Sequence, residues 1–283
     1  MRAVGRRQLE DWRVTCTAVV AGLVLATSLV AAQEIWVGAG RNSFMAPRWP
    51  KAEDFDGRFM YCRVFFQGPG RGGGLRTDYP GADNNFSVRL AELTRVDVKF
   101  DDNRLPHHVV VSLEDPLLFR CPMLFLVNHG SAWFSPQEAQ RLREYLQKGG
   151  LLWVDDAWGS YAWARWVDQV SRVLPPGEFP IRDIAMTHPV MHTLYDVKDI
   201  PQVPAISFWA GTGGQTSERG ADSAEVYFKG IADASGRMVV MTHNTDISDT
   251  WEREGERPRE YFDLFSPRGY AIGVNILLYA LTH

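Results

Sequence analysis

The feature that most constrains the fold is a series of short apolar runs that alternate with helix-like segments. The runs are 59–66 (FMYCRVFF), 122–127 (PMLFLV) and 151–155 (LLWVD). Continuous apolar runs of about four to eight residues are typical of strands buried on both faces of a parallel sheet. Parallel strands need crossover connections, which are usually helices that cover the sheet. The order of these segments therefore predicts an α/β domain with a mostly parallel sheet.

The segments between these runs carry the signals of helices. Residues 83–95 open with cap-type residues and then place apolar side chains at spacings of three and four. Ser135 and Glu138 form a capping box around a proline at the first helical position, and two glycines follow residue 148. Strands and helices thus alternate through short links, which favours helices on both faces of one sheet.

The second half of the chain is less regular but contains further elements. A tryptophan-rich helix is expected over 158–174, and strands are expected over 224–229 and 237–242. The closing segment 268–281 is apolar nearly all round but short, which favours a helix buried in the core over a membrane span. One more short strand is expected over 96–100.

The N-terminus differs from the rest of the chain. Residues 1–32 place four arginines before an apolar stretch that ends in small residues, which is the layout of a secretory signal peptide or a retained N-terminal anchor. Residues 33–57 form an irregular lead-in, and we expect a single α/β domain over 58–283. Either interpretation of residues 1–32 predicts a periplasmic or secreted domain, with membrane contact only through that segment.

The net charge argues against one class of partner, and the cysteines allow a disulfide. The formal charge of the 283-residue chain is −4, and loss of residues 1–32 removes four arginines, one Glu and one Asp, which leaves −6. A mildly acidic exported domain is a poor candidate for nucleic-acid binding. Cys62 and Cys121 remain after such a cleavage, and they either form a disulfide or stay as two buried thiols.

Several blocks of the sequence, in order, resemble one known family. These blocks are GRGGGLRTDYPGADNNF, LREYLQKGGLLWVDDAWGS, HPVMHTLYDV, HNTDISDTWE and GYAIGVNILLYALTH. They are similar to the bacterial domain-of-unknown-function (DUF) 4159 family over about residues 44–283. That family is grouped by fold with trehalose-utilisation-like and class I glutamine amidotransferase-like proteins. The resemblance implies a flavodoxin-like three-layer α/β/α domain and implies no particular biochemical activity.

In a doubly wound sheet, ligands bind beyond the carboxyl ends of the strands. Three of the expected strands deliver polar side chains to that edge of the sheet. The candidate ligand-binding residues are Arg63, Arg76, Asp78, Asp83, Asp155, Asp156, Trp158, His243 and Asp246. Asp249 follows the same strand as Asp246.

Carboxylates and imidazoles on one edge would suit a divalent cation, namely Ca²⁺ or Mg²⁺ with carboxylates and Zn²⁺ with histidines. The candidates for such a site are Asp155, Asp156, His188, His243 and Asp246. Their spacing matches no diagnostic metal motif, so no cofactor is firmly implied. The alternative is that the aspartates cap helices and hold loops, while His188 is a hydrogen-bonded structural imidazole.

Arg63 and the tryptophans each have two interpretations. Arg63 lies inside an apolar run and must be paired, either in a buried ion pair or, with Arg76, as a reader of anions. Exposed aromatic side chains beside carboxylates are typical of sugar binding, and Trp158 and Trp251 are open to that role. Trp163 and Trp166 are instead expected on the buried face of a helix.

The sequence lacks the residues that glutamine amidotransferase activity and nucleotide binding require. A glutamine amidotransferase needs a thiol on the sharp turn after a strand, but this turn reads Asp155-Asp156 and neither Cys62 nor Cys121 occupies it. Residues 68–74 contain G-x-G-x-x-G, but the next expected helix starts about nine residues late and no G-K-[ST] follows. Nucleotide binding is therefore disfavoured.

These observations favour a non-catalytic binding or interaction module over an enzyme. Its ligand would be polar, with carbohydrate as one candidate and a cell-envelope protein as another. The alternative is a divalent-metal-dependent hydrolase that uses the same acidic and histidine side chains to activate water.

Overall fold

Seven strands form one sheet in the part of the chain that the computed structural model describes, residues 46–66, 75, 78–255 and 257–283. Residues 1–32 and Arg76, for which predictions were made, lie outside the described residues. The strands are β1 (Tyr61–Phe65), β2 (His108–Ser112), β3 (Leu124–Val127), β4 (Leu152–Asp155), β5 (Arg182–Asp183), β6 (Phe228–Ala232) and β7 (Met238–His243).

The sheet is mostly parallel, as the sequence predicts. Its order is β2-β1-β3-β4-β7-β6-β5, and β2, β1, β3, β4 and β7 run in parallel. Strand β6 is antiparallel to β7, and β5 is antiparallel to β6. The chain moves to the other side of β1 between β2 and β3, and loops diverge at such a switch point, where α/β proteins place ligands.

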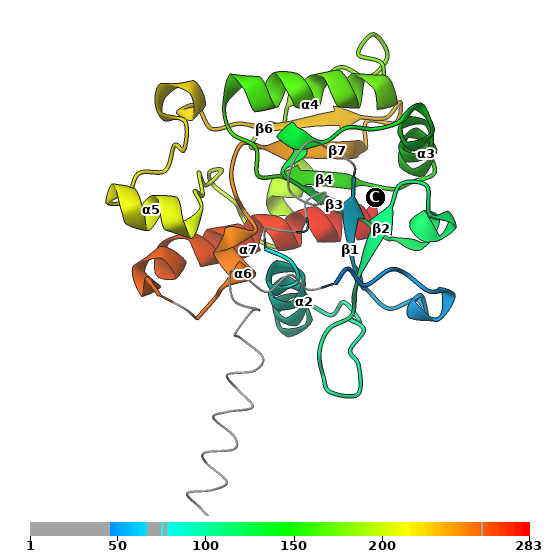
Figure 1. Cartoon of the computed structure of the whole chain (residues 1–283), viewed down its shortest axis with the longest axis horizontal. Helices are drawn as coiled ribbons and strands as arrows, with labels where there is room; N and C mark the ends of the chain where they lie inside the picture. The colour runs from blue at the N-terminus through cyan, green and yellow to red at the C-terminus, as the bar shows by residue number, and fades with distance from the viewer. Residues whose placement is uncertain (1–45, 67–74, 76–77, 256) are drawn as a thin grey trace, which may run out of the picture. The chain divides into compact units, whose positions relative to one another are not determined.

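Helices cover both faces of this sheet (Figure 1). The α-helices are α2 (Gly81–Leu93), α3 (Pro136–Gln147), α4 (Gly159–Val173), α5 (Ile206–Thr212), α6 (Asp249–Glu252) and α7 (Arg259–Thr282). Shorter 3₁₀ turns are η1 (Ala52–Asp54), η3 (Pro116–Arg120), η4 (His129–Ser131), η5 (Pro189–His192) and η6 (Gly220–Ser223). Among the described residues, no helix combines the length and the apolar character needed to span a membrane.

Two hydrophobic cores show that the fold has three layers. Alternate strand residues such as Tyr61 and Trp153 pack with side chains of α2, α6 and α7 on one face. Their neighbours Cys62 and Val154 pack with α3 and α4 on the other face. Since successive strand residues point to opposite faces, both faces of these strands are buried. The predicted flavodoxin-like α/β/α architecture is therefore confirmed.

Some predicted boundaries are wrong for identifiable reasons. The expected strand over 96–100 forms only isolated bridges, whereas β2 was not predicted. The final helix begins at Arg259 rather than 268 and continues through Pro267. A proline inside a helix removes one backbone hydrogen bond. Burial of Tyr261, Phe262 and Phe265, and the hydrogen bond that the Tyr261 hydroxyl donates to the carbonyl of Pro204 (2.7 Å), stabilise the part of the helix before Pro267.

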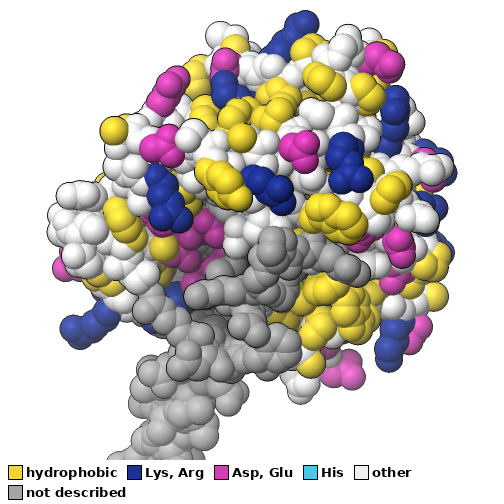
Figure 2. Space-filling view, turned by 45° about the horizontal axis from the view of Figure 1, so that its top comes forward, with side chains coloured by type: hydrophobic (Ala, Val, Ile, Leu, Met, Phe, Trp, Pro, Cys, Tyr) yellow, Lys and Arg dark blue, Asp and Glu magenta, His cyan; other side chains and the backbone are white. Residues whose placement is uncertain are grey.

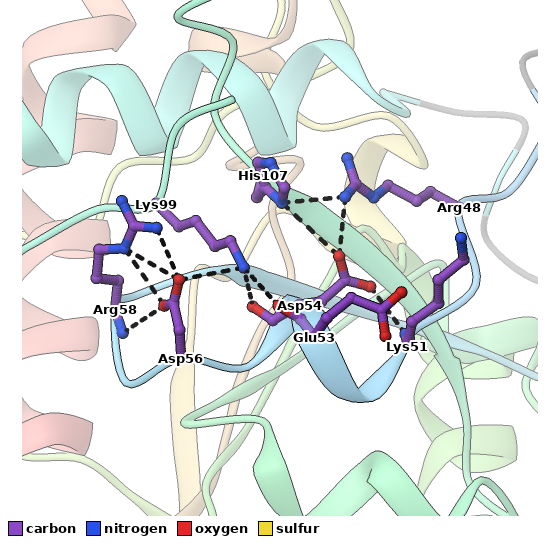
Figure 3. Close-up of polar contacts among 8 residues, drawn as sticks. All are labelled: Arg48, Lys51, Glu53, Asp54, Asp56, Arg58, Lys99 and His107. Carbon is purple, nitrogen blue, oxygen red and sulfur yellow. Dashed lines mark hydrogen bonds and ion pairs between the residues drawn. The ribbon is translucent and has the colours of Figure 1, made fainter. Parts of the chain in front are cut away.

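The lead-in residues are anchored beside the edge strand β2 (Figure 3). The ammonium group of Lys99 donates to the Asp54 carbonyl (2.6 Å) and pairs with Asp56 (3.2 Å). Arg48 pairs with Asp54 (2.9 Å), and its carbonyl accepts from the amide of Val110 in β2 (2.8 Å). An open strand edge invites pairing with other chains, and this segment covers part of it.

Cys62 and Cys121 form a disulfide, so the alternative of two buried thiols is wrong. The bond joins β1 to the segment before β3, and the two cysteines are 59 residues apart in the sequence. Both side chains are buried in the core beneath α3 and α4. A disulfide that closes a long loop stabilises the fold mainly by restricting the unfolded chain.

We expect the double substitution Cys62→Ala with Cys121→Ala to lower the free energy of unfolding by about 4 kcal/mol, the loop-entropy value for a loop of this length. Urea unfolding with and without reductant measures this change. The reductant should lower the midpoint of the parent protein and leave that of the double variant unchanged. Equal midpoints for the oxidised parent and the double variant would contradict the prediction.

Candidate functional site

Five aspartates meet beyond the carboxyl ends of β1, β4 and β7, and we call this group the acidic recess. Its members are Asp78, Asp155, Asp156, Asp246 and Asp249. Asp78 precedes α2, Asp155 ends β4, and Asp249 begins α6. Figure 2 shows acidic side chains gathered in a hollow on one face of the molecule. The sheet order thus brings together carboxylates that are far apart in the sequence.

Three of these carboxylates are close enough to share one ion. Asp78, Asp246 and Asp249 each offer an oxygen, and these oxygens all lie within 4.8 Å of one another. Two oxygens that bind the same Ca²⁺ at about 2.4 Å can be no more than about 4.8 Å apart. The three side chains are only 8%, 5% and 6% exposed. Their spacing therefore fits a common cation inside the recess.

Asp155 holds the loop that carries two of these residues. One of its oxygens accepts from the amide of Ile247 (3.1 Å), and the other accepts from the amide of Ser248 (3.0 Å). The loop-holding role that the sequence offered as an alternative therefore describes Asp155, which is fully buried. This clamp fixes the backbone between Asp246 and Asp249 opposite Asp78.

The hydroxyl of Ser248 lies among three carboxylates. Its oxygen is 2.8 Å from Asp78, 3.2 Å from Asp155 and 3.3 Å from Asp246. A hydroxyl has a single proton to donate, so it can satisfy only one of these acceptors at a time. The remaining oxygens need protons or a cation.

Asp156 differs from the other members of the recess because its side chain is partly exposed. Its backbone is left-handed (φ 56°), and its amide donates to the carbonyl of Thr245 (2.9 Å). Asp78 has a similar backbone (φ 64°), which Asp tolerates better than most residues. The neighbouring residue Trp158 is 8% exposed, and its indole Nε1 makes no hydrogen bond of ordinary geometry among the described residues but lies close enough to the Asp156 carboxylate to oppose the rise in pKa that burial causes.

Burial and mutual repulsion make the recess hard to ionise. Burial raises the pKa of Asp155 to about 7, against three backbone hydrogen bonds that lower it. Burial also raises the pKa of Asp78, Asp156, Asp246 and Asp249, and the neighbouring carboxylates add to the rise. None of the ion pairs between described residues includes these five side chains. Without a cation, the recess therefore retains protons near neutral pH.

This pattern predicts how stability depends on pH in a chelator. A carboxyl whose folded pKa is raised stabilises the protein fully below its unfolded pKa of about 3.9, and this contribution is lost as pH rises through the folded value. For Asp155 that loss occurs up to about pH 7. The free energy of unfolding should therefore fall as pH rises from about 6.5 through 7, where Asp155 alone gives a slope of roughly 1 kcal/mol per pH unit.

Buried histidines act in the opposite direction but only at lower pH. Burial lowers the pKa of His129 to about 4 and of His243 to about 3, so their contribution is lost as pH falls below about 6.5. Urea titrations above that value isolate the carboxyls. Asp246→Asn should flatten the slope, and the exposed Asp102→Asn should not. Stability that is constant or rises over this range in the parent protein would contradict the expectation.

Arg63 forms a buried ion pair with Asp83. Its Nε donates to both carboxylate oxygens (3.0 and 3.1 Å), Nη2 also donates to Asp83, and both side chains are fully buried. The guanidinium lies 5.9 Å from the ring centroid of Tyr79 and 5.7 Å from that of Phe125. Since β1 carries the arginine and α2 the aspartate, the pair ties the first helix to the sheet beside Asp78.

Loss of one member of this pair should be far more costly than loss of both. Arg63→Met leaves the Asp83 carboxylate buried without its partner, and we expect a loss of about 3–5 kcal/mol in the free energy of unfolding. Adding Asp83→Asn should recover part of that loss, as measured by a double-mutant cycle in urea. The exposed pair Arg58 and Asp56 is the control, and Arg58→Met should change little. Additive effects of the two buried substitutions would refute strong coupling.

The two candidate histidines lie apart from the three cation-ligand carboxylates. His243 is fully buried, and its ring stacks on Phe228 with centroids 4.0 Å apart. His188 caps η5 by accepting from the amide of Val190 (3.2 Å). The one metal-compatible group among the described residues contains Asp78, Asp246 and Asp249 and no imidazole. A carboxylate-only group favours Ca²⁺ or Mg²⁺ over Zn²⁺.

Sequence reasoning assigned no role to Ser248 and left Asp249 out of the candidate site. A signal for both was available in the segment HNTDISD, where Asp246 and Asp249 are three residues apart. That spacing places two side chains on the same side of a helical turn, and α6 begins at Asp249. The contribution of Asp78 could not be read in this way because it depends on the position of another loop.

The aromatic side chains divide into core and surface groups. Trp166 is 1% exposed in the core under α4, and Trp163 packs edge-on against Tyr227 with centroids 5.0 Å apart. Trp251 is fully buried between Phe86 and the sheet. Tyr161, in the first turn of α4, is 77% exposed. Near the carboxyl edge of the sheet, the ring of Tyr161 is therefore exposed, whereas Trp158 is mostly buried.

Comparison with protein families identifies the domain. The model of a domain of unknown function (DUF4159) matches residues 64–281, which is most of the chain. The chain belongs to the DUF4159 family. No curated protein matches its sequence. The DUF4159 region contains all five aspartates of the acidic recess, so the site belongs to the family domain itself.

Proposed function

We propose that this DUF4159 domain is an exported, non-catalytic binding module that takes up a polar ligand through a divalent cation in the acidic recess. The observation that carries the proposal is the convergence of Asp78, Asp246 and Asp249, whose oxygens lie within 4.8 Å of one another. Cell-envelope material is the expected source of the ligand. The relation to the amidotransferase-like fold is a further proposal, which the order of the parallel strands supports.

The need to neutralise buried charge supports a cation at this place. Isolated ionised carboxylates are costly to bury, and like charges close together raise that cost. The shared hydroxyl of Ser248 relieves at most one carboxylate. A hard divalent ion would replace the retained protons and satisfy several oxygens at once. Ca²⁺ suits the site better than Mg²⁺, because Ca²⁺ accepts irregular oxygen geometry.

The disulfide and the hydrogen bonds of Asp155 support binding rather than catalysis. The disulfide also supports export of the protein. Cys62 and Cys121 are joined in the disulfide, so neither provides a thiolate nucleophile. Both oxygens of Asp155 are engaged by the loop after β7, which leaves that carboxylate poorly placed to act as a base. A structural disulfide is typical of oxidising compartments, which supports a periplasmic or secreted location.

Calorimetric titration with Ca²⁺ tests the proposal directly. We expect saturable binding that stabilises the domain by about 2.7 kcal/mol when free Ca²⁺ exceeds Kd about 100-fold. Asp246→Asn should weaken binding at least about tenfold, since it removes one of three ligating carboxylates. The same substitution should stabilise the metal-free protein, because it removes repulsion in the recess.

The exposed Asp102→Asn is the matched control and should leave both properties unchanged. The proposal fails if Ca²⁺, Mg²⁺ and Mn²⁺ neither bind nor raise the unfolding temperature. Hydrolysis of model esters or phosphoesters that depends on the bound ion and is lost in Asp246→Asn would replace binding by the hydrolase alternative.

A further inference from the structure

We infer that the ligand of the acidic recess is a neutral polyhydroxylated molecule, a sugar or polyol, whose hydroxyl groups contact the bound cation and Asp156. This inference rests on the proposed function, because the cation provides one of the two contacts. It adds the chemical class of the ligand. Three features indicate that class: the charge of the recess, the adjacent carboxylate of Asp156 and indole of Trp158, which we call the corner, and the exposed ring of Tyr161.

The carboxylates of the cation site disfavour anionic ligands. One divalent ion offsets two negative charges, and three carboxylates would hold it, so the bound ion would offer an incoming phosphate or carboxylate group no excess positive charge. The nearest arginine of the described sheet, Arg63, is fully buried in its pair with Asp83. The cation site itself therefore disfavours phosphates and acids, which require basic groups in direct contact with them.

The cation excludes a ligand that carries only amines. Ca²⁺ takes about six to eight oxygen ligands, and the three carboxylates leave part of that shell to other oxygens. An ammonium group has donors but no oxygen lone pair. A hydroxyl has both, because its oxygen can coordinate the ion while its proton is donated to a carboxylate. A neutral ligand with adjacent hydroxyls meets both requirements.

Asp156 is the carboxylate that can accept a hydrogen bond from a hydroxyl group of the ligand. It is the partly exposed member of the recess, and the indole of Trp158 approaches its carboxylate. Trp158, which is more than nine-tenths buried beside it, has an indole Nε1 that faces this carboxylate and makes no hydrogen bond of ordinary geometry among the described residues. A carboxylate acceptor next to an indole donor complements one hydroxyl, which is both donor and acceptor. Neither a pure donor nor a pure acceptor would satisfy this corner.

Tyr161 adds a surface on which a sugar ring can stack. It lies in the first turn of α4, five positions after Asp156, and is 77% exposed. Helix α4 starts at the same carboxyl edge of the sheet as the recess, because it follows β4 directly. An exposed aromatic ring beside carboxylates offers an apolar face for the C–H side of a sugar while its hydroxyls turn to the polar groups.

The test titrates the full chain, loaded with Ca²⁺, with glucose, mannose and myo-inositol, and follows heat and tryptophan fluorescence. Glucose 6-phosphate is the charged counterpart of glucose. We expect at least one neutral compound to bind saturably in the millimolar range, only with Ca²⁺ present, and more tightly than glucose 6-phosphate.

Variants separate ligand contacts from the cation. Tyr161→Ala should weaken the neutral compound about tenfold while the Kd for Ca²⁺ is unchanged, and Asp156→Asn should weaken it at least as much. Leu281→Ala is the control, since it is 41% exposed at the end of α7, which contacts the start of β7 through Tyr279 and Met238.

The outcomes separate this inference from the function on which it rests. Saturable Ca²⁺ binding without any response to the neutral compounds overturns the inference and leaves the cation-dependent module standing. Tighter binding of glucose 6-phosphate than of glucose also overturns the inference and leaves the cation-dependent module standing. Absence of Ca²⁺ binding overturns both. Loss of sugar binding in Leu281→Ala as large as in Tyr161→Ala would also contradict the assigned contact.

Discussion

The carboxylate of Asp155 is the interaction on which the acidic recess depends. It ends β4, near the middle of the sheet, and accepts the amides of Ile247 and Ser248 in the loop after β7. Through this clamp the backbone between Asp246 and Asp249 is held opposite Asp78. The strand order therefore determines the structure of this edge. Because β4 and β7 are neighbours in the sheet, the buried side chain of Asp155 can position a loop that is nearly a hundred residues away in the sequence.

The recess works against the stability of the fold that contains it. Several buried carboxylates with raised pKa values lie close together, and the described residues provide no cationic side chain that pairs with them. Two cores, the disulfide and the buried pair of Arg63 with Asp83 stabilise the surrounding structure enough to tolerate this strain. Polar groups held in unfavourable surroundings are a common mark of functional sites.

The local parts of the fold could be predicted, and the nonlocal ones could not. The apolar runs that became β1, β3 and β4, and the capping box of Ser135 and Glu138, are local signals that tertiary packing did not override. The start of α7 could not be read, because the helix before Pro267 is stabilised by nonlocal contacts such as the hydrogen bond of Tyr261 to Pro204. In the same way, His243 lies at the carboxyl end of β7, yet its ring turns into the core against Phe228.

The sequence by itself determined the layer architecture, the carboxyl edge as the place for chemistry, and the acidic character of that edge. These follow from apolar periodicity and from which residues come directly after each strand. Tertiary structure decided that Asp78 meets Asp246 and Asp249, that Arg63 pairs with Asp83, and that Cys62 bonds to Cys121. Each of these contacts joins segments far apart in the chain. The sequence records only spacing along the chain, whereas strand order fixes which segments meet.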